Sequence, residues 1–160
     1  MFGGRVAFAF GFQCDDDPLE GLVVAAEDFF AADIRASTVL GQGELVEEIV
    51  LPKTDSPVKS SYMKYRQRKA IDFPLFSVAV VIEEENGMVK KASIVLGAAA
   101  PLPYRAESAE ALLVGKELTE SLAREAAEEA VKDAIPLFEN AYKAIAAKAY
   151  IRRAVTACIG

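Results

Sequence analysis

The sequence predicts an α+β fold in which an antiparallel sheet packs against three helices. Apolar residues alternate through the middle of the chain, which predicts strands. The Asn86-Gly87 pair predicts a hairpin there, because both positions of a tight turn tolerate positive φ. Alanine-rich stretches with helical apolar spacing occupy the last third. Strands followed by helices are typical of an α+β domain.

The first third of the chain has a less regular pattern. Alternation over residues 6–10 predicts a short strand, and the acidic stretch 14–18, which ends in proline, ends it. Residues 27–30 are compatible with one helical turn. An apolar stretch at 44–51 stops at a proline, and 53–59 is interpreted as a linker.

Three strands are predicted next, at residues 61–70, 75–84 and 88–96. Each of the last two carries its apolar residues on a single face, which predicts that this face covers the core. These residues are Phe76, Val78, Val80 and Ile82 on one strand, and Ala92, Ile94 and Leu96 on the other. Residues 97–103 are rich in Gly, Ala and Pro and are interpreted as a crossing segment.

The remaining residues predict three helices. The first spans 106–114 and ends at Gly115. The second is capped by Thr119 and stopped by Pro136. The third spans 138–159 and carries two apolar stripes. One stripe consists of Phe138, Tyr142, Ile145 and Ala149, and the other of Ile151, Val155 and Ile159.

Composition excludes several classes of function. A chain of 160 residues has room for one ordinary domain, or one domain and part of another. With no histidine, the chain cannot contain a histidine-based triad or a histidine-containing zinc site. Cys14 and Cys158 alone cannot build an iron–sulfur site, and two cysteines favour a reducing cytoplasm over a disulfide framework.

Charge and hydropathy limit the kinds of partner that the chain can bind. No apolar run reaches the roughly 18 residues that a membrane span needs. The net charge of −6 disfavours nucleic-acid binding. One segment, residues 59–69, is basic and contains two tyrosines. It is compatible with a solvated strand face, a phosphorylated cofactor, an acidic partner or, least of all, nucleic acid.

Few residues can carry chemistry by themselves. Neither cysteine has a histidine base, so both are interpreted as buried apolar residues. The acidic pairs 47–48 and 128–129 are adjacent in sequence, which favours solvated surface over a catalytic pair. The three aspartates at 15–17 lack the spacing of a calcium loop and are interpreted as a turn. The chemistry of the individual residues therefore indicates an α+β domain with one basic strand and identifies no function by itself.

An ordered series of motifs goes further. Five segments, in the right order, resemble the FAD-binding subunits of molybdenum hydroxylases, the family of xanthine dehydrogenases and aerobic carbon monoxide dehydrogenases. They are residues 26–30 (AEDFF), 43–52 (GELVEEIVLP), 62–74 (YMKYRQRKAIDFP), 95–106 (VLGAAAPLPYRA) and 110–119 (EALLVGKELT). The resemblance implies that residues 56–160 form the C-terminal α+β domain of that subunit. It implies that residues 1–55 are the end of an FAD-binding domain plus a linker.

The resemblance also implies a function. In that family the flavin subunit passes electrons from an iron–sulfur subunit, which receives them from a molybdenum-cofactor subunit, through FAD to an acceptor. Two flavin-contacting positions carry over, the aliphatic Val46 and the strand lysine Lys64. A lysine beside the flavin ring would favour its reduced anionic form by about a few kcal/mol. The opposing interpretation of Lys64 is an ordinary surface lysine.

The sequence also departs from the family pattern. The glycine-rich segments that bind the FAD pyrophosphate should precede residue 22, and the chain begins too late to hold them. The family element before the last helix keeps Tyr150, Arg152 and Arg153 but has lost its Asp-x-Arg part. We therefore expect the isolated chain to bind FAD weakly or not at all. The alternative is a non-catalytic interaction or assembly module, and a homo-oligomer remains open.

Overall fold

The computed structural model describes residues 5–7, 23–46, 49, 56–69 and 71–160. The chain divides into two compact units, Met1–Lys53 and Thr54–Gly160. Among the described residues, no helix combines the length and apolar character needed to cross a bilayer.

The first unit contains a short hairpin and one helical turn. Strand β1 (Arg5–Ala7) pairs antiparallel with β2 (Val23–Ala25), which leads directly into helix α1 (Ala26–Phe29). The predicted helical turn at 27–30 is therefore confirmed, shifted by one residue. The rest of the predicted strand at 6–10 and the acidic stretch 14–18 lie outside the described residues, as does most of 47–55.

The second unit is built on a four-stranded antiparallel sheet. Its strands are β3 (Val58–Tyr65), β4 (Phe76–Glu85), β5 (Met88–Gly97) and β6 (Tyr104–Arg105), in the order β3-β4-β5-β6. Strand β3 ends at Tyr65, five residues earlier than predicted, because Leu75 N–H donates to the Tyr65 carbonyl at 2.8 Å and closes a loop. The two-residue β6, directly after the predicted crossing segment 97–103, was not expected.

The predicted hairpin between β4 and β5 is confirmed. Asn86 and Gly87 both have positive φ, 54° and 77°, as a tight primed turn requires. The apolar face of each strand is buried as predicted, with Phe76, Val78, Val80 and Ile82 at most 1% exposed. This face of the sheet therefore covers the core.

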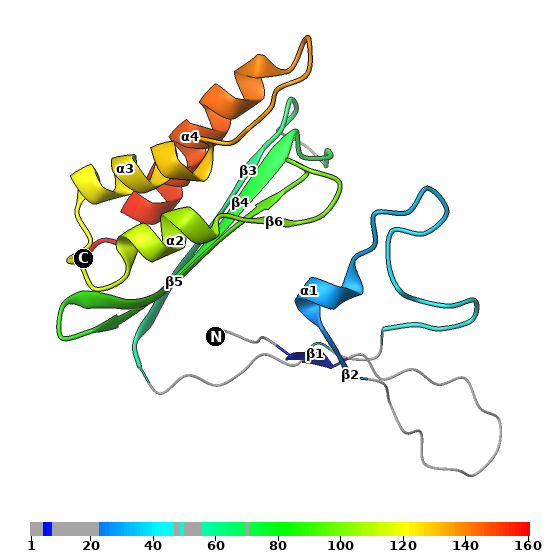
Figure 1. The fold of residues 1–160 in the computed structure, drawn as a ribbon, viewed down its shortest axis with the longest axis horizontal. Coiled ribbons are helices and arrows are strands. Elements are labelled where there is room, and N and C mark those ends of the chain that lie inside the picture. The colour runs from blue at the N-terminus through cyan, green and yellow to red at the C-terminus, as the bar shows by residue number, and fades with distance from the viewer. Residues whose placement is uncertain (1–4, 8–22, 47–48, 50–55, 70) are drawn as a thin grey trace. The chain divides into compact units, whose positions relative to one another are not determined.

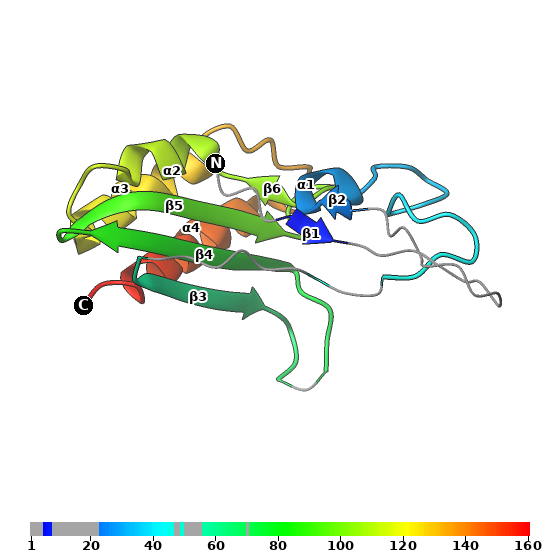
Figure 2. The ribbon, with the colours of Figure 1, turned by 90° about the horizontal axis from the view of Figure 1, so that it is seen from below.

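Three helices cover that same face of the sheet (Figures 1 and 2). They are α2 (Glu107–Leu113), α3 (Glu120–Ala130) and α4 (Ala141–Thr156). The predicted cap is present, since Thr119 Oγ1 accepts the N–H of Leu122 at 3.2 Å. Gly115 has φ 77° just beyond α2, as expected for a residue that follows a helix end. The α+β prediction of a sheet on three helices is confirmed for this unit.

The boundaries of the helices differ from the prediction: α2 is one residue shorter at each end, and α4 ends at Thr156 rather than 159. Helix α3 ends at Ala130, before Pro136 can act, because Val131 N–H donates to the carbonyls of Glu128 and Glu129 and tightens the last turn. Helix α4 begins at Ala141 rather than 138. Of its two predicted stripes, the one with Ile151, Val155 and Ile159 is buried at Ile151 and Val155, whereas Ile159 lies beyond the end of the helix and is exposed. The stripe of Phe138, Tyr142 and Ile145 is exposed.

A buried ion pair fastens α2 to the sheet. The Glu110 carboxylate accepts the backbone N–H of Ile94 on β5 at 2.8 Å and Nε of Arg105 on β6 at 3.0 Å. Arg105 Nη2 lies 2.9 Å from the same carboxylate. Glu110 is only 7% exposed, so this carboxylate serves as a structural acceptor for two strands.

Candidate functional site

Lys64 lies on the face of the sheet that no helix of this unit covers. Its neighbours on β3, Met63 and Tyr65, pack against the core, so Lys64 points to the opposite face. The register places Lys64 opposite Ser77, and Ser77 opposite Gly97. Lys64, Ser77 and Gly97 thus lie side by side on three adjacent strands and form a row of one cation and two small residues.

The small size of this row is required by close packing. A Cβ added to Gly97 would lie 2.6 Å from Ser77 Oγ, closer than real Cβ contacts. Gly97 therefore lets β5 approach Ser77, and neither residue covers the open face beside Lys64. Within the described part of the chain, the Lys64 ammonium forms no ion pair or hydrogen bond. This is the arrangement expected where a charged group is left available to a ligand.

An aromatic cluster anchors the strands beneath this row. Tyr65, Phe76 and Tyr150 pack with ring centroids 5.2 to 5.5 Å apart and join β3, β4 and α4. The Arg153 guanidinium lies 5.8 Å from the centre of the Tyr150 ring. Tyr150, which survives from the family element before the last helix, therefore holds α4 against the end of the sheet where Lys64 lies, and Arg153 covers its ring from the same helix.

The loop after β3 continues the site. Asp72 accepts the backbone N–H of Arg68 at 3.1 Å and that of Phe73 at 3.0 Å, and its carboxylate pairs with the Arg68 guanidinium at 3.1 Å. The hydrogen bond from the Arg68 side chain, with further help from Lys64, lowers the pKa of Asp72. The ion pair fixes the loop, and Ile71 and Phe73 remain almost fully exposed on it. Exposed apolar groups of this kind mark surfaces that become covered on binding.

The second predicted flavin-contacting residue, Val46, belongs to the first unit. It is half-buried in an irregular segment, 44–46, that follows the turn closed by the Gly41 carbonyl and Glu44 N–H. Val46 and Lys64 are thus contributed by different units, and each is placed only within its own unit.

The basic segment 59–69 is divided among different partners. Lys59 pairs with Glu84 at 2.7 Å, and Arg68 pairs with Asp72. Because these pairs point to different elements, the segment does not present one continuous basic surface.

The other candidate residues from the sequence lie in surroundings that fit a structural role. Cys158 is buried, and this burial raises the pKa of its thiol, so it behaves as an apolar residue. Glu128 pairs with Lys148 and Glu129 with Lys132, so that acidic pair lies in separate surface ion pairs. Cys14, the aspartates at 15–17 and Glu47-Glu48 lie outside the described residues. Within the described ranges, no group of three or more Cys, Asp or Glu side chains could hold a metal ion.

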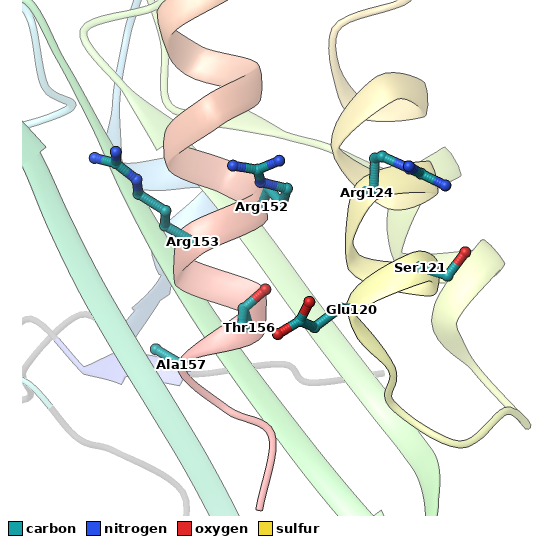
Figure 3. Close-up of a pocket in the computed structure, with 7 residues that line it drawn as sticks. All are labelled: Glu120, Ser121, Arg124, Arg152, Arg153, Thr156 and Ala157. Atoms are coloured by element: carbon teal, nitrogen blue, oxygen red, sulfur yellow. The ribbon is translucent and has the colours of Figure 1, made fainter.

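A charged groove lies between α3 and α4. It encloses about 630 Å³ and is lined by Arg124, Arg152 and Arg153 together with Glu120 and Thr156. Figure 3 shows Glu120 and Thr156 facing each other, whereas Arg124 and Arg153 point away from the groove in opposite directions. The guanidinium groups do not converge on one point, so the groove does not form an anion site.

Comparison with known proteins identifies relatives of this chain. The glyceraldehyde dehydrogenase medium chain of Sulfolobus acidocaldarius is 33% identical over 104 residues, which cover 65% of this chain and 36% of that protein. The carbon monoxide dehydrogenase structure from Hydrogenophaga pseudoflava matches with a TM-score of 0.78 and 29% identity, over 98% of this chain and 53% of that one. Quinoline 2-oxidoreductase from Pseudomonas putida matches with a TM-score of 0.75 and 26% identity, over the same 98% and 53%.

These relatives are longer proteins. This chain spans 53% of each of the two matched structures and 36% of the curated relative. The family described as "CO dehydrogenase flavoprotein C-terminal domain" matches residues 61–158, which is more than half of the chain. The match includes β3 with Lys64, the β4–β5 hairpin and all three helices of the second unit. The resemblance noted in the sequence is thereby confirmed, and this chain belongs to the CO dehydrogenase flavoprotein C-terminal domain family.

Proposed function

We propose that this chain is part of the flavin subunit of a molybdenum hydroxylase, which relays electrons from iron–sulfur clusters through FAD to an acceptor. Membership of the flavoprotein C-terminal domain family is the observation that carries the proposal. The ammonium of Lys64, which forms no ion pair with any described residue and lies on an uncovered sheet face, supports it from the structure. The chain works in this role together with the segments that bind the FAD pyrophosphate.

Lys64 supplies the charge in this proposal. When bound, FAD supplies the electron-carrying chemistry. The Lys64 ammonium offers it a positive charge, and Ser77 and Gly97 leave room beside that charge. The strand that carries Lys64 is anchored by the cluster of Tyr65 and Phe76, which holds the lysine in place.

Val46 and the first unit complete the proposal. Residues 1–55 are assigned to the end of an FAD-binding domain plus a linker, with the aliphatic Val46 side chain as an apolar contact for the flavin. The partners are a molybdenum-cofactor subunit and an iron–sulfur subunit. One of the relatives supports this assignment, since it is described as a carbon monoxide dehydrogenase in a form that lacks the Mo-pyranopterin moiety of its molybdenum cofactor. A cytoplasmic location accords with the use of only two cysteines.

A domain exchange tests the proposal. Residues 56–160 replace the corresponding C-terminal domain of the Sulfolobus glyceraldehyde dehydrogenase medium chain, and flavin content is read from absorbance and from release by heat. We expect the exchanged protein to retain flavin at the level of its parent. Lys64→Ala in that protein should weaken flavin retention or lower the flavin reduction potential, because it removes a positive charge. Lys69→Ala, a lysine exposed on the loop, is the matched control.

The result separates the two functions considered. A flavin-free exchanged protein, made from a parent that holds flavin, contradicts the proposal and favours the non-catalytic interaction module. Equal flavin retention and equal potential in Lys64→Ala and Lys69→Ala would contradict the role of Lys64 alone. Titration of this chain by itself with FAD is expected to show weak binding or none, and stoichiometric flavin there would contradict that expectation.

A further inference from the structure

A second hollow lies on the opposite side of the sheet from the row around Lys64. It encloses about 420 Å³, within the range of small-molecule sites. Its floor consists of Phe76 and Leu96 from the sheet and Ala147 from α4, all buried. The segments 99–101 and 131–136 form two of its walls.

Small residues create this cavity. Helix α3 ends early, at Ala130, and α4 begins eleven positions later at Ala141, so the connection crosses the end of the sheet without filling it. Ala134 and Ala144 line the space where larger side chains would close it. An apolar cavity that is left open in this way suits an apolar or aromatic body.

The charges around the cavity select the polar group of the ligand. Of the residues that line it, only Lys143 and Asp133 are charged. Lys143 is half-buried and forms no ion pair within the described ranges, whereas Asp133 is exposed to water on a turn. Lys143 also lies in the first turn of α4, where the helix dipole adds to the positive potential. A half-buried ammonium without a counter-ion favours an anion more than an exposed carboxylate favours a cation.

We propose that this cavity binds a small apolar carboxylate, whose hydrocarbon part occupies the alanine-lined space and whose carboxylate pairs with Lys143. The site is separate from the proposed flavin-contacting row, which uses the opposite face of the sheet. It is made by the second unit alone.

The test uses a matched pair of probes with the full 160-residue chain. The acid 3-phenylpropionate and its neutral analogue 3-phenylpropan-1-ol are titrated and followed by the amide shifts of the ¹⁵N-labelled protein. We expect saturable shifts for the acid, confined to the lining at 76, 96–104 and 130–147, with a dissociation constant of about 1 mM. The alcohol should bind about threefold to tenfold more weakly.

Variants locate the interaction. Lys143→Gln should remove the preference for the acid, whereas Lys116→Gln, a lysine outside the cavity, should leave it unchanged. Ala144→Leu fills the cavity and should abolish binding of both probes. Ala141→Leu, on the same helix but outside the cavity, should leave binding intact. Thermal melts show whether each variant is folded, and the Lys143 comparison holds even if Ala144→Leu is not.

Three outcomes would overturn the proposal. They are an absence of saturable shifts up to about 20 mM of the acid, equal binding of acid and alcohol, and binding by folded Ala144→Leu at the wild-type level. None of these outcomes depends on flavin, so they are distinguishable from a failure of the proposed function.

Discussion

Replacing Glu110 by alanine tests whether one buried carboxylate holds α2 and β6 to the sheet. In the native protein this carboxylate accepts the Ile94 N–H at 2.8 Å and pairs with the Arg105 guanidinium at 2.9 Å. Glu110→Ala removes the acceptor for a buried backbone N–H on β5. It also removes the counter-ion of an arginine side chain that is 36% exposed.

The magnitude follows from these two losses. A buried backbone donor left without a partner costs about 1–3 kcal/mol. Loss of a fully buried ion pair costs about 3–5 kcal/mol. The pair contributes much less here, because water reaches the Arg105 side chain and solvates its charge. We therefore expect the free energy of unfolding to fall by about 2–4 kcal/mol. For a domain of this size the corresponding drop in melting temperature is about 8–16 °C.

The assay is urea unfolding followed by far-ultraviolet circular dichroism, with thermal melts in parallel. Glu110→Gln should lose about half as much stability, because its amide oxygen still accepts the Ile94 N–H. Glu107→Ala, which removes an exposed carboxylate one turn earlier on α2, is the control and should change stability by less than about 0.5 kcal/mol. If Glu110→Ala and Glu107→Ala unfold at the same urea concentration, the carboxylate does not hold the strands and the reasoning is wrong.

Three further predictions concern the second unit. Gly97→Ala should lower the free energy of unfolding by about 1–3 kcal/mol, because the new Cβ would lie 2.6 Å from Ser77 Oγ. Adding Ser77→Gly to the same chain should restore its stability in urea. Equal stability of the single and the double variant would contradict the clash. Since the pKa of Asp72 is lowered in the folded protein, its stabilising contribution is complete above the unfolded value of 3.8 and is lost as pH falls through the lower folded value. Asp72→Asn should therefore flatten the acid limb of a stability–pH curve, and an unchanged limb would argue against the Arg68 pair. Buried Cys158 should react with a thiol reagent only at the rate of local opening, so reaction as fast as that of a free thiol would refute its burial.

The candidate site was only partly predictable. Lys64 was found through the motif in which it lies, and its place on a strand followed from alternation. The row it forms with Ser77 and Gly97 joins residues 13 and 20 positions apart in sequence, as the register shows. No local sequence pattern marks small residues on different strands as neighbours. Only the pairing of the strands shows that these residues lie side by side.

Helix α4 shows a similar limit. Its sequence carries two apolar stripes, and periodicity treats both as equally good candidates for burial. The structure buries the one with Ile151 and Val155, which faces alanine-rich α3 and the sheet. The other stripe, with Phe138 and Tyr142, is exposed. The choice depends on how closely α3 packs, which is a property of two helices together.

The β4–β5 hairpin separates what the sequence determined from what the tertiary structure decided. The Asn86-Gly87 turn and the apolar alternation of each strand were legible in the sequence and are confirmed. The position of the turn and the apolar alternation, however, predict different registers. Counting outward from the turn would pair Ile82 with Lys91, which sets an apolar face against a polar one.

The structure resolves the conflict with a bulge beside the turn. Pairing passes from Glu84↔Val89 to Glu83↔Lys91, so that β5 contributes Lys90 as an additional residue, and Ile82 then faces Ala92. The same shift places Ser77 opposite Gly97 and so builds the row beside Lys64. The sequence by itself determined the turn, the strands and which faces are apolar. Only the tertiary structure decided the register, because burying both apolar faces in one core outweighs the loss of regular pairing at one residue.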